Sequence, residues 1–134
     1  MKVDTRTGRI EFERGVLERG TEKARFLQSR LGADAAILVK NGQHLTYGIR
    51  PEQGISATVL FEGPVLKTVT WQIELTLEKE RVWSVENELE RKRLHDSWLA
   101  AAIGMPPYEY AWGRLESDYD SKGCASSIIV SYAD

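Results

Sequence analysis

The chain of 134 residues has little that would tie it to an oxidising compartment or to a membrane. It carries one cysteine, Cys124, which cannot form a disulfide within the chain, so we expect a fold that does not depend on oxidation. No window comes near about 18 uninterrupted apolar residues. Residues 1–8 lack the apolar stretch of a signal peptide. These absences predict a cytoplasmic protein that does not enter a membrane.

The chain also lacks a strong charge of either sign. Lys and Arg number 18 and Asp and Glu number 20, which gives a formal net charge of −2. Binding to nucleic acid usually requires a basic excess, so this balance argues against a nucleic-acid partner. No repeat, low-complexity stretch or linker interrupts the sequence. We therefore predict one domain that spans residues 1–134.

The residue types that carry catalysis are present, but without the spacing that catalysis needs. His44 and His95 show no metal-ligand spacing to each other or to Cys124. The sequence has no Gly-x-Ser-x-Gly elbow, no phosphate-binding loop and no dinucleotide-binding glycine motif. We therefore predict no catalytic residue, no cofactor and no metal. We expect His95 to lie on the apolar stripe of a helix.

Alternation of apolar and polar residues predicts the strands. Asn41-Gly42 lies between two apolar runs and predicts a two-residue hairpin turn. That turn would place Leu38 opposite Leu45, and Ala36 opposite Tyr47, on one apolar face. Further strands are predicted over residues 9–13, 55–61, 65–77, 108–115 and 125–132.

A short helix is predicted between the first strand and the hairpin. Thr21 is suited to cap its N-terminus, and the apolar stripe ends at Leu31. Gly32 follows where a left-handed residue usually ends a helix. Such a short helix gains its stability from docking against the rest of the protein.

A longer helix is predicted from Ser84 to about Ile103, where Gly104 ends it. On its exposed side, Glu88 and Lys92 have the spacing of a surface ion pair. Short turns join the predicted strands, so neighbouring strands are antiparallel. The predicted fold class is therefore α+β: a two-layer domain in which a mostly antiparallel sheet is packed by one long and one short helix.

The acidic segment of residues 116–122 is predicted to be a loop between the last two strands. From Asp118 onward it begins like a calcium-binding loop, but Lys122 and Ile129 stand where oxygen ligands are required. We therefore reject a calcium site. Acidic groups on a loop can instead orient a cationic partner. The predicted partner-binding residues are Glu116, Asp118, Tyr119, Asp120 and Lys122.

The stretch from residue 83 to residue 132 is the most distinctive part of the chain. It combines Trp83-Ser84, Trp98-Leu99, Tyr110-x-Trp112-Gly113 and Tyr119-Asp120-x-Lys122-Gly123. In this pattern the chain resembles small uncharacterised bacterial cytoplasmic proteins, some of which are similar to immunity proteins encoded beside secreted antibacterial toxins. The resemblance implies a non-enzymatic protein that binds and neutralises one toxin. It assigns no roles to individual residues.

Two other functions fit the same sequence. One is a small-molecule-binding protein or an enzyme, with a pocket between the long helix and the sheet that Trp83, Trp98 and Trp112 line. The other is a homodimer formed by pairing exposed edge strands. Protein binding without catalysis is the function we expect, and these two are its alternatives.

Overall fold

The structure is a computed structural model that describes residues 1–134, and it contains strands and helices in the proportions of an α+β protein. In chain order the elements are β1 (Lys2–Asp4), β2 (Arg9–Phe12), β3 (Gly15–Leu17), α1 (Lys23–Gln28), β4 (Ala36–Asn41), β5 (His44–Glu52), β6 (Ile55–Glu62), β7 (Val65–Ile73), α2 (Leu77–Arg81), α3 (Val85–Ile103), β8 (Tyr108–Tyr110), β9 (Gly113–Asp120) and β10 (Ala125–Tyr132). The predicted α+β class is confirmed, with an antiparallel sheet against which one long helix packs.

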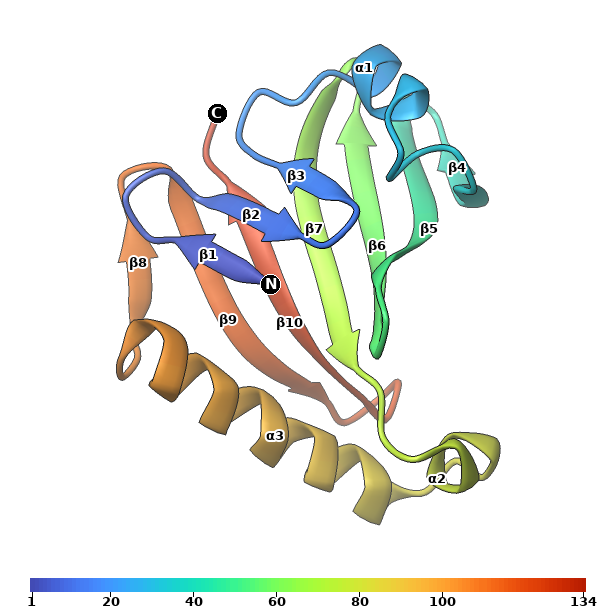
Figure 1. Cartoon of the computed structure of the whole chain (residues 1–134), viewed down its shortest axis with the longest axis vertical. Helices are drawn as coiled ribbons and strands as arrows, with labels where there is room; N and C mark the ends of the chain where they lie inside the picture. The colour runs from blue at the N-terminus through green and yellow to red at the C-terminus, as the bar shows by residue number, and fades with distance from the viewer.

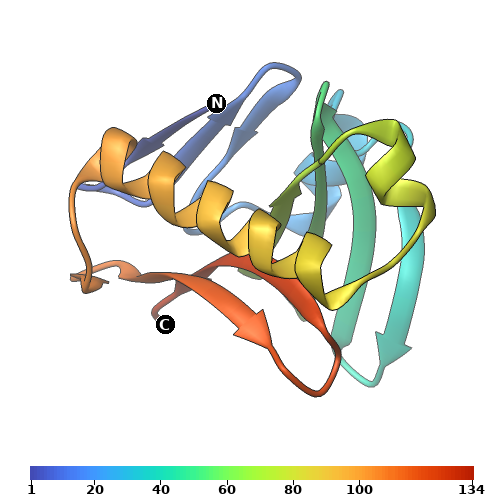
Figure 2. The same cartoon turned by 90° about the horizontal axis from the view of Figure 1, so that it is seen from below.

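The strands form two separate sheets. The larger has seven strands in the order β4-β5-β6-β7-β10-β9-β8, and every neighbouring pair in it is antiparallel. The smaller, β1-β2-β3, was not predicted as a separate sheet. The large sheet bends strongly, and both α3 and the small sheet lie inside the bend (Figures 1 and 2). Its outer face carries no helix.

The core fills the space inside this bend. The inward residues of β6 are all buried, which confirms the alternation predicted for residues 55–61. Phe26 of α1 packs against the rings of Tyr47 and Phe61, so α1 covers β5 and β6. Phe12 of the small sheet meets Trp71 of β7 edge to face. Large aromatic side chains therefore join α1 and the small sheet to the large sheet.

The predicted hairpin forms, but its register differs by one residue. Gly42 and Gln43 make the turn, and Asn41 pairs with His44. Gly42 has a φ of 60°, whereas neither of its neighbours has a positive φ. Glycine is thus needed at the first position of this turn, rather than at the second as predicted. An irregularity at Leu38 shifts the remaining pairs, so the predicted pairings with β5 are wrong.

β7 is shorter than the predicted strand. It ends at Ile73, because the Thr76 side chain accepts a hydrogen bond from the backbone N–H of Lys79 and caps a helix, α2, that was not predicted. Leu77 was predicted to be the last residue of this strand, but it is the first residue of α2 and is 70% exposed. Val65 is also exposed, since the pairing of β7 with β6 is irregular nearby.

α1 is shorter than predicted at both ends. Glu22 rather than Thr21 precedes it, and the Thr21 hydroxyl donates instead to the backbone oxygen of Glu18. Gly32 does not have the predicted left-handed conformation. A Cβ atom there would lie 2.1 Å from the backbone oxygen of Phe26, so close approach of the chain to itself requires glycine.

The predicted ends of α3 are confirmed, but its buried face is largely polar, while Val85 and Leu89 of the predicted apolar stripe are exposed. The Ser84 hydroxyl accepts the N–H of Asn87 at 3.0 Å, and Gly104 follows the helix at a φ of 89°. The side chains that α3 buries are Glu88, Arg91, His95 and Leu99. The predicted surface pair between Glu88 and Lys92 is therefore wrong. Lys92 pairs with Asp96 at 2.7 Å instead.

These buried polar residues attach α3 to two strands. Arg91 Nη1 donates to the backbone oxygen of Ile73 at 2.5 Å, and His95 Nε2 accepts the Ile73 N–H at 3.0 Å. Glu88 accepts the backbone N–H of Ser126, on β10, at 3.0 Å. Arg91 and Glu88 also form an ion pair at 3.3 Å. Hydrogen bonds and ion pairs thus hold α3 against the sheet at this interface, where apolar packing usually holds a helix.

Replacing Glu88 with Gln keeps the shape of the side chain but removes one charge that offsets Arg91, which would retain only Glu80. We expect the free energy of unfolding to fall by about 2–3 kcal/mol, because a buried guanidinium loses a counter-charge. Urea unfolding followed by tryptophan fluorescence measures the change. Glu86→Gln, on the exposed side of the same helix, is the control and should cost less than about 0.5 kcal/mol. Equal losses for the two variants would contradict the role given to Glu88.

Candidate functional site

The acidic segment predicted to bind a partner is mostly strand rather than loop. β9 continues through Asp120 and pairs with β10 along its whole length, so the turn is reduced to residues 121–124. Glu116, Asp118 and Asp120 alternate along β9 and share its outer face. Tyr119 lies between the aspartates in sequence but on the opposite face. The three carboxylates therefore form a row that is separate from the tyrosine.

Lys122 and Cys124 lie in the turn between β9 and β10. The Lys122 backbone N–H donates to Asp120 Oδ1 at 3.0 Å, which is the geometry of an Asx turn. Cys124 is partly exposed, and its thiol donates to the backbone oxygen of Ser121 at 3.4 Å. Neither histidine lies in this turn. The turn is thus held together by its own hydrogen bonds.

The three tryptophans of the predicted helix–sheet pocket lie in different surroundings. Trp98 meets Trp71 edge to face, and Trp112 is buried with its Nε1 donating to the Thr5 backbone oxygen at 2.8 Å. Trp83 is 60% exposed and donates to the backbone of the β9–β10 turn. None of the main cavities includes any of the three. They do not form a common lining.

No three His, Cys, Asp or Glu side chains lie together in an arrangement that could hold a metal ion. None of the three helices combines the length and the apolar character needed to cross a membrane. His44 is exposed at the end of the β4–β5 hairpin, whereas His95 is completely buried.

His95 belongs to the buried cluster on α3, which brings together residue types that also serve in catalysis. Burial, and secondly the nearby Arg91 guanidinium, lower the pKa of His95 from 6.5 to about 4. Because Nε2 accepts the N–H of Ile73, the neutral ring carries its proton on Nδ1. No large cavity reaches His95. Its contacts are those of a residue that holds α3 against β7.

Three consecutive apolar side chains are exposed on β4, an edge strand of the large sheet. Ile37, Leu38 and Val39 are 62%, 56% and 56% exposed, and every residue of β4 is exposed. The sequence predicted that Leu38 and Ala36 share one apolar face with Leu45 and Tyr47. The predicted pairing is wrong, because Ile37 rather than Ala36 lies opposite Tyr47 and Lys40 lies opposite Leu45. Consecutive exposed apolar residues on a strand edge are unusual in a protein that acts alone. A second exposed apolar stretch lies on α2 and the start of α3 and comprises Leu77, Val82, Trp83, Val85 and Leu89.

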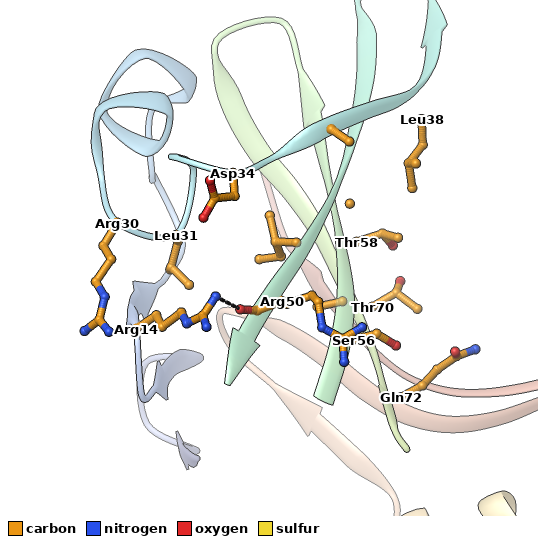
Figure 3. A pocket seen from close by; sticks show the side chains of 14 residues that line it. Arg14, Arg30, Leu31, Asp34, Leu38, Arg50, Ser56, Thr58, Thr70 and Gln72 are labelled. Atoms are coloured by element: carbon orange, nitrogen blue, oxygen red, sulfur yellow. Dashed lines mark hydrogen bonds between the residues drawn. The ribbon is translucent and has the colours of Figure 1, made fainter. Parts of the chain in front are cut away.

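The largest cavity, of about 510 Å³, begins beside β4. Arg14 reaches it from the β2–β3 turn, Arg30 from the end of α1 and Arg50 from β5, and Asp34 is the one acidic residue in its lining. Figure 3 shows Arg14, Arg30 and Asp34 to one side of the β5 ribbon, and hydroxyl side chains such as those of Thr58 and Thr70 to the other. The cavity is therefore basic on the side nearer α1.

Sequence reasoning missed this part of the molecule. The three arginines are 16 or more residues apart and share no motif. The apolar run of β4 was visible, but its periodicity cannot distinguish a covered strand from an uncovered one. A slight basic surplus in residues 1–34 was the only signal that could have indicated a basic surface here.

Comparison of the chain with models of protein families, with curated proteins and with solved structures finds no match in any of the three. The likeness to immunity proteins thus stays a prediction from the sequence. The features from which a function can be argued are those described above: the acidic row on β9, the buried cluster on α3, and β4 with its arginine cavity.

The low pKa of His95 makes stability depend on pH. In the unfolded chain this histidine takes up a proton as the pH falls through about 6.5, whereas in the folded protein it does so only near 4. The unfolded state therefore binds more protons between these pH values. As a result, the free energy of unfolding decreases as the pH is lowered. We expect His95 to account for a loss of about 2 kcal/mol from about pH 7 to pH 5.

Urea unfolding at several pH values measures this dependence. His95→Gln should flatten it over this range, even though the variant is less stable at neutral pH. His44→Gln, at an exposed position, is the matched control. If His95→Gln kept the full slope, the buried histidine would not be its origin.

Proposed function

We propose that this chain is a non-enzymatic protein-binding module that holds one partner on β4. The observation that carries the proposal is the exposed apolar run Ile37, Leu38 and Val39 on an edge strand. An edge strand offers unpaired backbone N–H and C=O groups as well as its side chains, and partners commonly bind such edges. Covering a large aliphatic side chain fully stabilises a complex by up to about 1.5–3 kcal/mol. Three adjacent ones are a suitable centre for an interface.

The finer form of the proposal is an immunity protein that binds and neutralises a toxin. Its support is the sequence resemblance, together with a rigid sheet whose interior is filled and whose open surface lies at one edge. The proposal places the protein in the cytoplasm, where a fold that needs no disulfide is stable. It includes no nucleic acid and no membrane as partner.

A homodimer through β4 is the second candidate, since a second copy could cover the same surface. The charge of this edge argues against it, because β4 has no acidic residue and carries Lys40, so two copies of it would repel each other. Light scattering at micromolar concentration separates the two: a monomer mass favours a different protein as partner. A stable dimer would replace the proposal.

Ile37→Lys tests the surface directly. The side chain is exposed, so the fold should be retained, but a cation in the centre of the interface should weaken partner binding at least about tenfold. The assay is co-expression with the product of a neighbouring gene that is toxic alone: the native chain should restore growth and the variant should not. Calorimetry with the purified pair then gives the affinities.

Leu77→Lys is the matched control, because Leu77 is a comparably exposed aliphatic residue on α2 and should leave binding unchanged. Asp118→Lys tests the acidic row on β9. Loss of rescue with Asp118→Lys but not with Ile37→Lys would move the interface from β4 to β9. A neighbouring product that is harmless alone would remove the toxin from the proposal.

A further inference from the structure

The arginine cavity adjoins β4 and extends the same surface. Ala36 and Leu38 belong to β4 and also line the cavity. A ligand that covers the apolar run therefore reaches the cavity without crossing another element. Its volume of about 510 Å³ is in the range of pockets that hold a ligand group.

Two of the three arginines lack an acidic partner within the protein. Arg50 forms an ion pair with Glu74. Arg14 donates only to the backbone oxygen of Arg50 at 3.0 Å, and no ion pair engages Arg30. Guanidinium groups prefer planar anions such as carboxylates, which they bind through two parallel hydrogen bonds. The cavity thus has unused capacity for a carboxylate.

A second copy of this chain that paired through its own β4 would not supply that carboxylate. β4 has no acidic residue, and it carries Lys40 near its end. Two β4 strands side by side would add positive charge to a region that already has it. The charge of the surface fits a different chain, one that is acidic where it passes the cavity.

We propose that the partner contributes an extended segment that lies along β4 and inserts a Glu or Asp side chain between Arg14 and Arg30. This inference rests on the proposed function and adds the chemistry of the partner: alternating apolar and acidic residues on a strand. The apolar residues of the segment cover β4, and its carboxylate occupies the basic part of the cavity. Such addition of a strand to a sheet edge gives affinity through the backbone and selectivity through side-chain pockets.

The test uses a short peptide that alternates valine with glutamate, and a matched peptide with lysine in place of glutamate. The ¹⁵N-labelled full chain is titrated with each, and NMR detects even weak binding. We expect the acidic peptide to shift the β4 amide signals together with the Nε–H signals of Arg14 and Arg30. The lysine peptide should leave the arginine signals unchanged. No shift with the acidic peptide up to its solubility limit would overturn the inference.

Variants separate the charge contact from the strand contact. The double variant Arg14→Glu/Arg30→Glu should lower the affinity for the acidic peptide at least about tenfold, because two favourable charge pairs become repulsive. Arg25→Glu is the control, since Arg25 is an exposed arginine of α1 that lines a different cavity. Equal affinities for the double variant and the control would overturn the inference.

Inorganic phosphate distinguishes a free anion from a protein segment. If phosphate shifts the Arg14 and Arg30 signals as strongly as the peptide does, and β4 stays unmoved by either, the cavity serves a small anion and the inference fails. The proposed function fails differently. If the toxin still binds the Ile37→Lys variant, β4 is not the binding surface. If the toxin no longer binds Ile37→Lys but still binds the arginine double variant, only the acidic contact is disproved.

Discussion

The hydrogen bonds between α3 and the last residue of β7 are the contact on which the rest of this structure depends. β10 pairs with β7 only as far as Trp71, so Ile73 has no strand beside it on that side. Its N–H and C=O would be buried without partners if His95 and Arg91 did not bind them. Because α3 satisfies these groups, the large sheet can bend around the helix without leaving unpaired backbone in the core.

This arrangement also explains why the helix has so little apolar character on its buried side. Arg91 must carry its charge inside, and Glu88 and Glu80 offset it. His95 is kept neutral by the same surroundings that make it a hydrogen-bond acceptor for β7. Residue types that would suggest catalysis are therefore occupied in holding the helix. The exposed apolar and charged groups that a partner could bind lie elsewhere, towards the two ends of the large sheet.

The two edge strands of the large sheet, β8 and β4, differ in length and exposure. β8 is a three-residue edge next to the end of α3, and short edge strands attract few partners. β4 is longer, fully exposed and apolar, and α1 stops short of covering it. The outer face of β9 bears carboxylates, while the arginines lie beside β4. A partner therefore meets an apolar, basic edge at one end and an acidic row at the other.

The α+β class, most strand positions and the limits of α3 could be predicted from the sequence, because they depend on local periodicity and on caps such as Ser84 and Gly104. Which faces are buried depends on tertiary contacts. An apolar run looks the same whether or not something covers it, so the periodicity of β4 could not reveal that it is exposed. Polar residues look like a surface until partners from distant strands meet them, as Glu88 meets β10. The arginine cavity depends on the same long-range contacts, which periodicity does not encode.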